Sequence, residues 1–153
     1  MESFHIRQAM PCDVKQLLNI EYTCFSSDRI SVQQMQYLVS KAKSSIFLVL
    51  EDTRKNLAGY VLAFAPKNKV TARIYSLAIL PQFRGQHLAS YLLQHLFEML
   101  NQKGYQYCHL EVRESDEKTQ KLYQKFGFVQ MKKLLNYYED GEHAWRMRVV
   151  LKS

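Results

Sequence analysis

The chain has 153 residues, of which 47% are hydrophobic and 23% are charged, and its net charge is +7. This size and balance fit one globular domain over residues 1–153 and exclude a disordered or fibrous chain. The basic residues are dispersed along the chain, so we expect a solvated basic surface and no direct nucleic-acid partner.

The N-terminal part has the pattern of one strand followed by two helices. Apolar and polar residues alternate over residues 4–7, which predicts a short strand. Pro11 and Asp13 mark the start of a helix, and Ser31 is the expected cap of a second one. Phe25 and Arg29 lie on the connection between these helices, where they either line a site or cover the sheet. Covering the sheet is the favoured interpretation.

Three strands are expected next, over residues 45–51, 57–65 and 70–79. Each is a short run rich in apolar residues, and polar turns separate the runs. Gly59 interrupts the second run and predicts either a bulge or a close approach of another backbone. Together the three segments predict a meander.

The stretch from residue 74 to residue 91 organises the rest of the chain. It has the pattern of an apolar strand, a turn after Pro81 and a helix that opens within residues 84–89. Leucines at helical spacing continue this helix to Gly104, so that about twenty residues span about 30 Å. A strand over residues 108–112 then completes a right-handed β–α–β crossover. Free amides at the N-terminus of such a helix bind phosphate or pyrophosphate.

The C-terminal part is predicted to form a short helix and a hairpin. Ser115 or Asp116 caps a helix over residues 117–126, and Gly127 ends it. Two strands, over residues 128–135 and 143–151, follow and pair around a loop at residues 136–141.

Five short segments occur in a fixed order along the C-terminal half. They are YSLAI-x-P from Tyr75, RGQHLA from Arg84, LEVR from Leu110, LY-x-x-FGF from Leu122, and NYY followed by DG from Asn136. This ordered set resembles the GNAT superfamily of acyl-CoA-dependent N-acyltransferases, and within it the ribosomal-protein-alanine N-acetyltransferase branch. Residues 1–56 match only in the order of their predicted elements.

The resemblance implies a fold and an acyl donor. The fold class is α/β (α+β): a mixed, mostly antiparallel twisted sheet of about six to seven strands flanked by about four helices, with its two central parallel strands splayed into a V. The donor is acetyl-CoA, and no metal is implied. In such proteins the splayed strand pairs with the pantetheine arm, and a loop of pattern Arg/Gln-x-x-Gly-x-Gly/Ala holds the pyrophosphate. The matching positions are Leu77, Ala78, Ile79, Arg84, Gly85, Gln86, His87, Leu88, Ala89 and Ser90.

Two of the cofactor positions depart from the family pattern. His87 stands where glycine is usual; its amide donor survives, but its side chain can crowd a phosphate. That side chain either points to solvent, which is favoured, or donates to the pyrophosphate. Asp116 stands where asparagine is usual, and CoA contact and helix capping are equally open for it.

Acetyl transfer to an amine needs an acceptor for the ammonium proton and a donor for the CoA thiolate. By resemblance, Glu111 is the general base and Tyr123 is the general acid. In the alternative interpretation, Glu111 is a carboxylate paired with Arg113 or Arg84, and Tyr123 is a core aromatic of its helix. The departure at the loop glycine also keeps open a non-catalytic acyl-CoA-binding module, against which the presence of both catalytic positions argues.

The amine acceptor is the least defined part of the prediction. By resemblance, Tyr137 and Tyr138 shape a site for a protein N-terminus, with Phe25 and Arg29 as the opposite wall. Acidic residues in the tyrosine-bearing loop suit an amine-bearing substrate. We therefore expect a protein or peptide N-terminus, with a small-molecule amine such as a polyamine or an antibiotic as the alternative.

The remaining features bear on location and assembly. The three cysteines, Cys12, Cys24 and Cys108, form no closely spaced pair, which argues against a disulfide scaffold and a zinc site. No apolar run has the length of a membrane span or the form of a leader. We expect a cytoplasmic monomer or homodimer with no membrane partner.

Overall fold

Seven strands form one mixed sheet in a computed structural model that describes residues 3–151. The sheet has the order β1-β2-β3-β4-β5-β7-β6. Its strands are β1 (Phe4–Gln8), β2 (Ser45–Asp52), β3 (Leu57–Phe64), β4 (Thr71–Ile79), β5 (Tyr107–Arg113), β6 (Val129–Leu134) and β7 (Ala144–Val150). The helices are α1 (Val14–Cys24), α2 (Val32–Ser40), α3 (Leu88–Gln102) and α4 (Glu117–Lys125), with 3-10 turns at Pro11–Asp13 and Pro81–Phe83. The expected domain limits, residues 1 and 153, lie outside the described residues.

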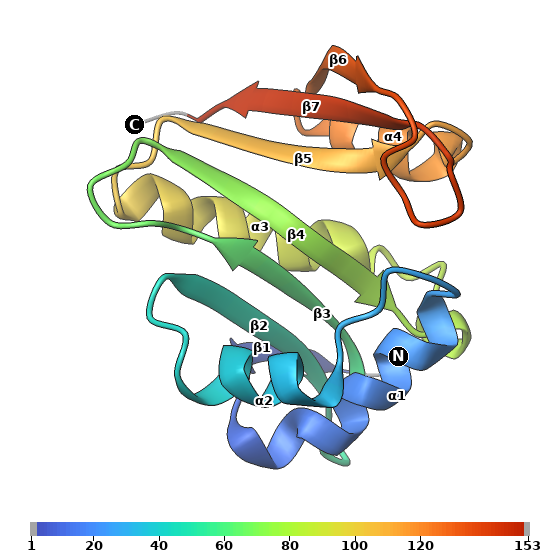
Figure 1. The fold of residues 1–153 in the computed structure, drawn as a ribbon. Helices are drawn as coiled ribbons and strands as arrows, with labels where there is room; N and C mark the ends of the chain where they lie inside the picture. Colours follow the sequence, from blue (N-terminus) through green and yellow to red (C-terminus); the bar gives the residue numbers. More distant parts are fainter. Residues whose placement is uncertain (1–2, 152–153) are drawn as a thin grey trace.

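Helices cover both faces of the N-terminal strands. Figure 1 shows α1 and α2 on the near face of the sheet and α3 on the far face. On the near face Leu17, Ile20 and Met35 are fully buried against β2 and β3. On the far face the leucines of α3 belong to a second buried cluster. Burying one such side chain contributes about 1.5–3 kcal/mol, so these two layers hold the sheet in place.

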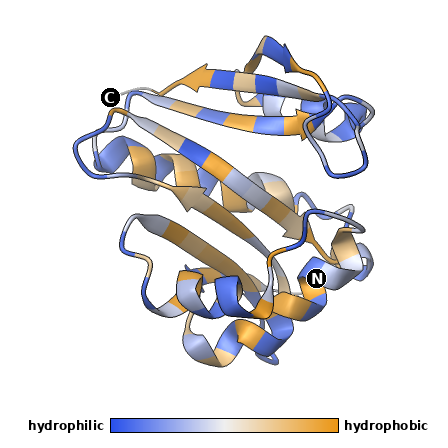
Figure 2. Ribbon diagram, viewed as in Figure 1, coloured by the Kyte–Doolittle hydropathy of each residue, from blue (hydrophilic) through white to orange (hydrophobic). Residues whose placement is uncertain are grey.

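The C-terminal strands have only one covered face. Figure 2 shows mostly hydrophobic residues along β2 and β3, whereas hydrophobic and hydrophilic residues alternate along β5 and β7. In β5 the buried residues Cys108, Leu110 and Val112 alternate with half-buried ones. Such alternation is typical of a strand that faces a core on one side only. None of the helices within residues 3–151 is long and apolar enough to cross a membrane.

The two central strands are parallel and then diverge, which confirms the expected V. β4 and β5 pair only where residues 71–73 lie beside residues 107–109. Past that point β4 carries a bulge, because Leu62 pairs with Ser76 while Ala63 pairs with Ile74, which leaves Tyr75 as an extra residue. A bulge bends its strand and increases the local twist, so it helps to turn β4 away from β5.

Gly59 is a point of close approach, one of the two possibilities that the sequence predicts, and a bulge lies directly beside it. The pairing of β2 with β3 skips Ala58, since Leu50 pairs with Gly59 and Glu51 with Leu57. A Cβ at Gly59 would lie 2.4 Å from the carbonyl oxygen of Ala78. That distance is shorter than any real Cβ contact, so glycine is required for β4 to lie at this distance from β3.

The expected helix caps are confirmed. The Ser31 hydroxyl accepts a hydrogen bond from the Gln34 amide at 3.1 Å, at the start of α2. The Asp116 carboxylate likewise accepts from the Thr119 amide at 3.1 Å, at the start of α4. Each cap satisfies one of the unpaired amides of a helix N-terminus.

The expected length of the central helix was wrong. α3 has 15 residues rather than about twenty, and it begins at Leu88. Gly85 and His87 take left-handed backbone angles, with φ of 84° and 60°. A right-handed helix cannot include such residues, so residues 84–87 form a loop that leads into α3.

Candidate active site

The open end of the V holds a cavity of about 490 Å³. Its walls come from the α1–α2 connection, the diverging parts of β4 and β5, the start of α4 and the β6–β7 loop. Seven of the predicted site residues line it: Phe25, Leu77, Glu111, Asp116, Tyr123, Tyr137 and Tyr138. Segments far apart in the sequence therefore meet where the two central strands separate.

Glu111 lies between two arginines at the floor of this cavity. Its side chain is 3% exposed; Arg73 Nη2 lies 2.6 Å from Oε1, and Arg146 Nε lies 2.9 Å from Oε2. Burial alone would raise the pKa of Glu111, but hydrogen bonds and charge from Arg146 and Arg73 outweigh it and lower the pKa. The carboxylate is therefore ionised at neutral pH.

The expected alternative partners of Glu111 were wrong. Neither Arg113 nor Arg84 pairs with it in the described residues. Glu111 pairs with Arg146 because the two lie directly opposite each other in the β5–β7 register. Arg73 reaches the carboxylate from β4, the other neighbour of β5. This register cannot be read from β5 alone, so neither partner could be predicted from the residues around Glu111.

Tyr123 is both a core residue and a cavity residue. It is 4% exposed, and its ring lies 5.4 Å from that of Phe128 in the cluster under α3. Burial, the largest cause, and nearby acidic groups raise the pKa of its hydroxyl. The hydroxyl stays protonated at neutral pH and can donate a hydrogen bond into the cavity.

The loop before α3 presents a row of unused donors. None of the backbone N–H groups of residues 85–90 has an acceptor within the part of the chain that the structure describes. These amides lie at the positive end of the α3 dipole, the arrangement that binds phosphates. His87 is exposed and is the N-cap residue of α3. This loop lies outside the lining of the cavity itself.

Arg84 and Ile79 differ from the simplest expectation for cofactor contacts. The Arg84 side chain folds back, and its Nε donates to the Ile79 carbonyl oxygen at 2.9 Å. Cys24 Sγ also lies 3.5 Å from that oxygen. The Ile79 carbonyl, expected to be free for a ligand, is thus already an acceptor within the chain. Leu77 lines the cavity, whereas Ala78 is buried under α1.

The two loop tyrosines are held by arginines. The Tyr137 hydroxyl accepts a hydrogen bond from Arg73 Nη2 at 3.2 Å. The Arg113 guanidinium lies 4.1 Å from the centre of the Tyr138 ring. The two tyrosine rings pack edge to face, 5.0 Å apart. Both side chains therefore have defined positions on the cavity wall.

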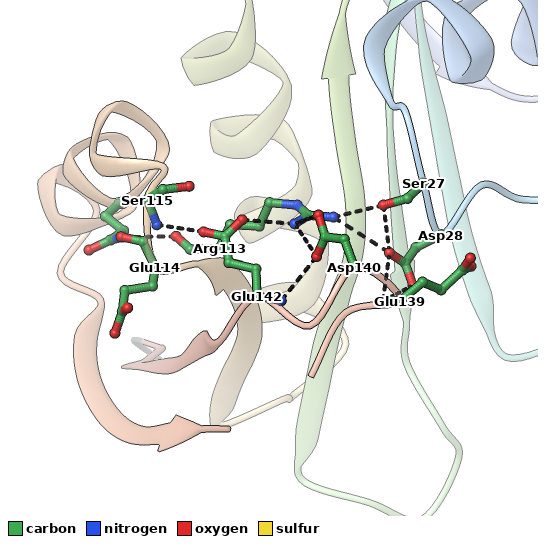
Figure 3. Close-up of polar contacts among 9 residues, drawn as sticks. Ser27, Asp28, Arg113, Glu114, Ser115, Glu139, Asp140 and Glu142 are labelled. Carbon is green, nitrogen blue, oxygen red and sulfur yellow. Dashed lines mark hydrogen bonds and ion pairs between the residues drawn. The ribbon is translucent and has the colours of Figure 1, made fainter. Parts of the chain in front are cut away.

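Arg113 joins the loops on the two sides of the cavity, as Figure 3 shows. It donates to the Ser27 hydroxyl at 2.8 Å and lies 3.5 Å from an Asp28 oxygen, both on the α1–α2 connection. It also contacts Asp140 at 2.9 Å and Glu142 at 2.8 Å, both on the β6–β7 loop. We call this arrangement the Arg113 clasp. Its carboxylates are engaged within the chain, so the acidic loop is less available to a substrate amine than the sequence suggested.

Arg29 is the one predicted wall residue that lies away from the cavity. Its guanidinium lies 4.6 Å from the centre of the Tyr22 ring and donates to the Tyr22 carbonyl at 3.2 Å. Phe25, four residues earlier, does line the cavity. The difference arises because the connection turns between the two residues, which sequence spacing does not reveal.

Glu21 and Ser76 are among the polar residues of the cavity wall that sequence reasoning missed. Glu21 is 2% exposed on α1. It stands four residues after Leu17 and so lies on the same buried face of the helix, and a charged residue at that spacing from an apolar one was the available signal. No group of three or more potential metal-ligating side chains occurs within residues 3–151.

Residues 13–128 match the model of the acetyltransferase (GNAT) family. The chain belongs to this family. It is 31% identical over 142 residues to a putative ribosomal protein bS18-alanine N-acetyltransferase of Bacillus subtilis, covering 92% of this chain and 91% of that one. These matches make the protein an acetyl-CoA-dependent N-acetyltransferase.

Solved structures share the fold of this GNAT protein. A ribosomal-protein-alanine N-acetyltransferase from Escherichia coli superimposes with a TM-score of 0.88 at 23% identity, covering 99% of this chain and 96% of that one. A spermidine N-acetyltransferase from Vibrio cholerae, in complex with CoA and spermine, superimposes with a TM-score of 0.82 at 20% identity, covering 97% and 95%. The fold alone therefore accommodates protein and polyamine acetyltransferases.

Proposed function

We propose that this GNAT protein transfers the acetyl group of acetyl-CoA to the α-amine of a protein or peptide N-terminus. The observation that carries the proposal is that Glu111 and Tyr123 both line the cavity in the V. The amine nitrogen attacks the thioester carbonyl carbon, and the C–S bond breaks. The ammonium proton leaves to a base, and the thiolate of CoA takes up a proton.

The loop before α3 and the strand β4 suit the donor. The free amides of residues 85–90 would hold the pyrophosphate, with the exposed His87 at the edge of this cradle. The arm would then run along the unpaired part of β4 past Leu77 towards the cavity, close to Asp116. Among residues 77–79, the occupied Ile79 carbonyl is available to the arm only if Arg84 moves.

The two catalytic roles follow from the protonation states of the side chains. Glu111 is ionised, so it attracts the substrate ammonium and serves as general base, directly or through a water molecule. Tyr123 is protonated and donates its proton, or a strong hydrogen bond, to the departing thiolate. The general-acid role requires the hydroxyl alone and leaves CoA binding to other residues.

Charge on the open sheet face favours a peptide over a polyamine. Arg73 and Arg146 flank Glu111, and the exposed Arg148 and Lys132 lie on the same face. A polyamine would bring several positive charges to this face and be repelled. A peptide brings one ammonium to the cavity, where Phe25, Tyr137 and Tyr138 surround it.

The test is thiol release from acetyl-CoA over a panel of N-terminal peptides, polyamines and aminoglycosides, with mass spectrometry of the products. Acetylation of peptide α-amines supports the proposal. Acetylation of polyamines or aminoglycosides alone contradicts the acceptor class. Binding of acetyl-CoA without release across the whole panel indicates a non-catalytic module instead.

Tyr123→Phe is expected to lower kcat by about 100-fold, because it removes only the hydroxyl that meets the thiolate. The KM for acetyl-CoA should stay within about twofold, since the ring remains in the core. Tyr105→Phe is the matched control: that hydroxyl donates to the Pro66 carbonyl at 2.8 Å, away from the cavity. A fully active Tyr123→Phe enzyme would rule out the general-acid role.

A further inference from the structure

A buried carboxylate on α1 reaches the cavity wall, and the proposed chemistry does not use it. Glu21 lines the cavity while only 2% exposed. Its Oε2 accepts the Ile30 amide at 2.8 Å, which holds the α1–α2 connection. Its Oε1 accepts the hydroxyl of Tyr60 on β3. The contact between Oε2 and Ile30 has a structural role, because it holds the connection in place. The contact between Oε1 and Tyr60 joins Glu21 to the sheet.

Tyr60 links Glu21 to strand β4 by a further hydrogen bond. Its hydroxyl lies 2.8 Å from the Ser76 hydroxyl. Tyr60 itself is fully buried between α1 and the sheet, whereas Ser76 is half-buried and lines the cavity. A continuous chain of hydrogen bonds therefore runs from the cavity through Ser76 and Tyr60 to Glu21.

The donors in this chain can have only one order when Glu21 is ionised. An ionised carboxylate accepts hydrogen bonds and donates none, so the single proton of the Tyr60 hydroxyl points to Glu21. The 2.8 Å contact must then be a hydrogen bond that Ser76 donates to Tyr60. This leaves the lone pairs of Ser76 Oγ free to accept a proton in the cavity.

We propose that Ser76, Tyr60 and Glu21 form a proton relay that removes the first proton of the acceptor ammonium, before the attack, and leaves Glu111 to accept the second proton, which the nitrogen loses as the amide forms. The ammonium gives a proton to Ser76 Oγ, Ser76 gives its own to Tyr60, and Tyr60 gives its own to Glu21. The nitrogen gains a lone pair, Glu21 becomes neutral, and no other bond changes. Ser76 is the only relay member that touches substrate; Tyr60 and Glu21 act through it. The relay rests on the proposed acetyl transfer.

The charges around the relay suit this direction of proton flow. Burial, the largest cause, raises the pKa of Glu21 above its usual value, although hydrogen bonds from Tyr60 and Ile30 and the charge of Arg29 oppose the shift. Cys24, on the same helix, also faces Glu21, and its pKa is raised, so it remains a neutral thiol. Glu111 has a lowered pKa and is the weaker proton acceptor of the two carboxylates. The relay therefore delivers the proton to Glu21, which is a stronger base than Glu111.

The decisive measurement is kcat against pH for a peptide that the wild type acetylates. A free α-amine has a pKa of about 7.7–8.0, so an enzyme without the relay must wait for the amine to deprotonate in solution. Ser76→Ala and Tyr60→Phe should lower kcat at about pH 7 by about tenfold, because only about a tenth of the amine is neutral at that pH. Activity should recover above about pH 8, and the KM for acetyl-CoA should be unchanged. Ser76→Thr, which keeps a hydroxyl, should restore most of the activity.

Tyr105→Phe, the buried-tyrosine control, should keep the wild-type pH profile. A wild-type profile in both Ser76→Ala and Tyr60→Phe would overturn the relay. So would a loss of kcat that is equal at every pH, which would indicate a structural role only. A wild type that releases no thiol with any amine would instead contradict the proposed function, so the two failures are distinguishable.

Discussion

At the scale of single residues, His87 is the position where the backbone conformation fits the residue type least well. It caps α3 with φ of 60°, a left-handed backbone that glycine adopts without cost and that a side chain with a Cβ adopts at about 1–2 kcal/mol. The same position is where the family pattern has glycine. The side chain is exposed, in keeping with the solvent-facing interpretation. Its backbone, rather than its imidazole, is the part under strain.

His87→Gly should therefore raise the free energy of unfolding. Relief of about 1 kcal/mol of strain is partly offset by the greater entropy of a glycine in the unfolded chain, which leaves a gain of about 0.5 kcal/mol. Thermal melting should show a rise of about 1–2 °C. His87→Ala, which keeps the Cβ, should show no such rise, and a destabilised glycine variant would refute the strain argument.

The same two variants test a contact between the imidazole and the pyrophosphate. If the imidazole faces solvent, the affinity of the wild type for acetyl-CoA divided by that of each variant should be the same at about pH 6 and at about pH 8. A contact predicts that acetyl-CoA binds the wild type more tightly than either variant, by a factor that differs between the two pH values. Isothermal titration at both pH values separates the two outcomes.

Single residues also mark the limit of prediction from sequence. Glu111 and Tyr123 could be found because each lies in a short motif, LEVR or LY-x-x-FGF, that is local in the chain. The partners Arg73 and Arg146 could not, since they meet Glu111 only through strand register. Burial of Glu21 likewise depends on how α1 packs on β3. Local motifs predict which residues line the cavity, whereas protonation states depend on tertiary contacts.

At the scale of elements, the strands and helices with clear periodicity were predictable and the loops were not. The meander, the crossover and the hairpin follow from alternation and leucine spacing. The predicted helix begins earlier in the chain than α3 does. The difference arises because two residues of the loop before α3 have left-handed backbone angles, in a segment that contains no proline. The side-chain direction of Arg29 failed for a similar reason, because an irregular connection has no fixed period.

The Arg113 clasp is an element-scale device, since it ties the α1–α2 connection to the β6–β7 loop. Arg113→Gln should loosen both loops, because glutamine cannot keep all of these contacts at once. Amide exchange in residues 24–30 and 136–143 should accelerate about tenfold, equivalent to about 1.4 kcal/mol, with β2 and β3 unaffected. The KM for the peptide acceptor should rise with it.

Lys133→Gln is the control for the clasp. It breaks the surface pair between Lys133 and Glu114, which joins neither loop. Exchange in the two loops should match the wild type in this variant. Unchanged loop exchange in Arg113→Gln would mean that backbone contacts alone hold the two loops together.

At the scale of the whole molecule, where the net charge is +7, several of the basic residues lie together on the sheet face beside the cavity. Residues opposite each other in a sheet share a face, which puts Arg73, His109 and Arg148 in one row and Glu111, Arg146 and Lys132 in the next. α1 and α2 pack against β2, β3 and β4 and leave this face open. With Glu111 the single carboxylate in these two rows, the face has an excess of positive charge.

This face predicts how the enzyme ranks peptide acceptors. A peptide whose amine enters the cavity extends its next residues over Arg146, Arg148 and Lys132, so acidic side chains there gain exposed ion pairs of about 0.2–1 kcal/mol each. Two such pairs should raise kcat/KM about tenfold over a neutral peptide, and basic side chains should lower it. The preference should shrink towards unity at about 0.5 M salt, because exposed pairs are screened. Arg148→Glu should reduce the preference for acidic peptides at low salt. The kcat for the neutral peptide should be unchanged in this variant. A peptide ranking that responds neither to salt nor to this variant would contradict an acceptor path across the sheet.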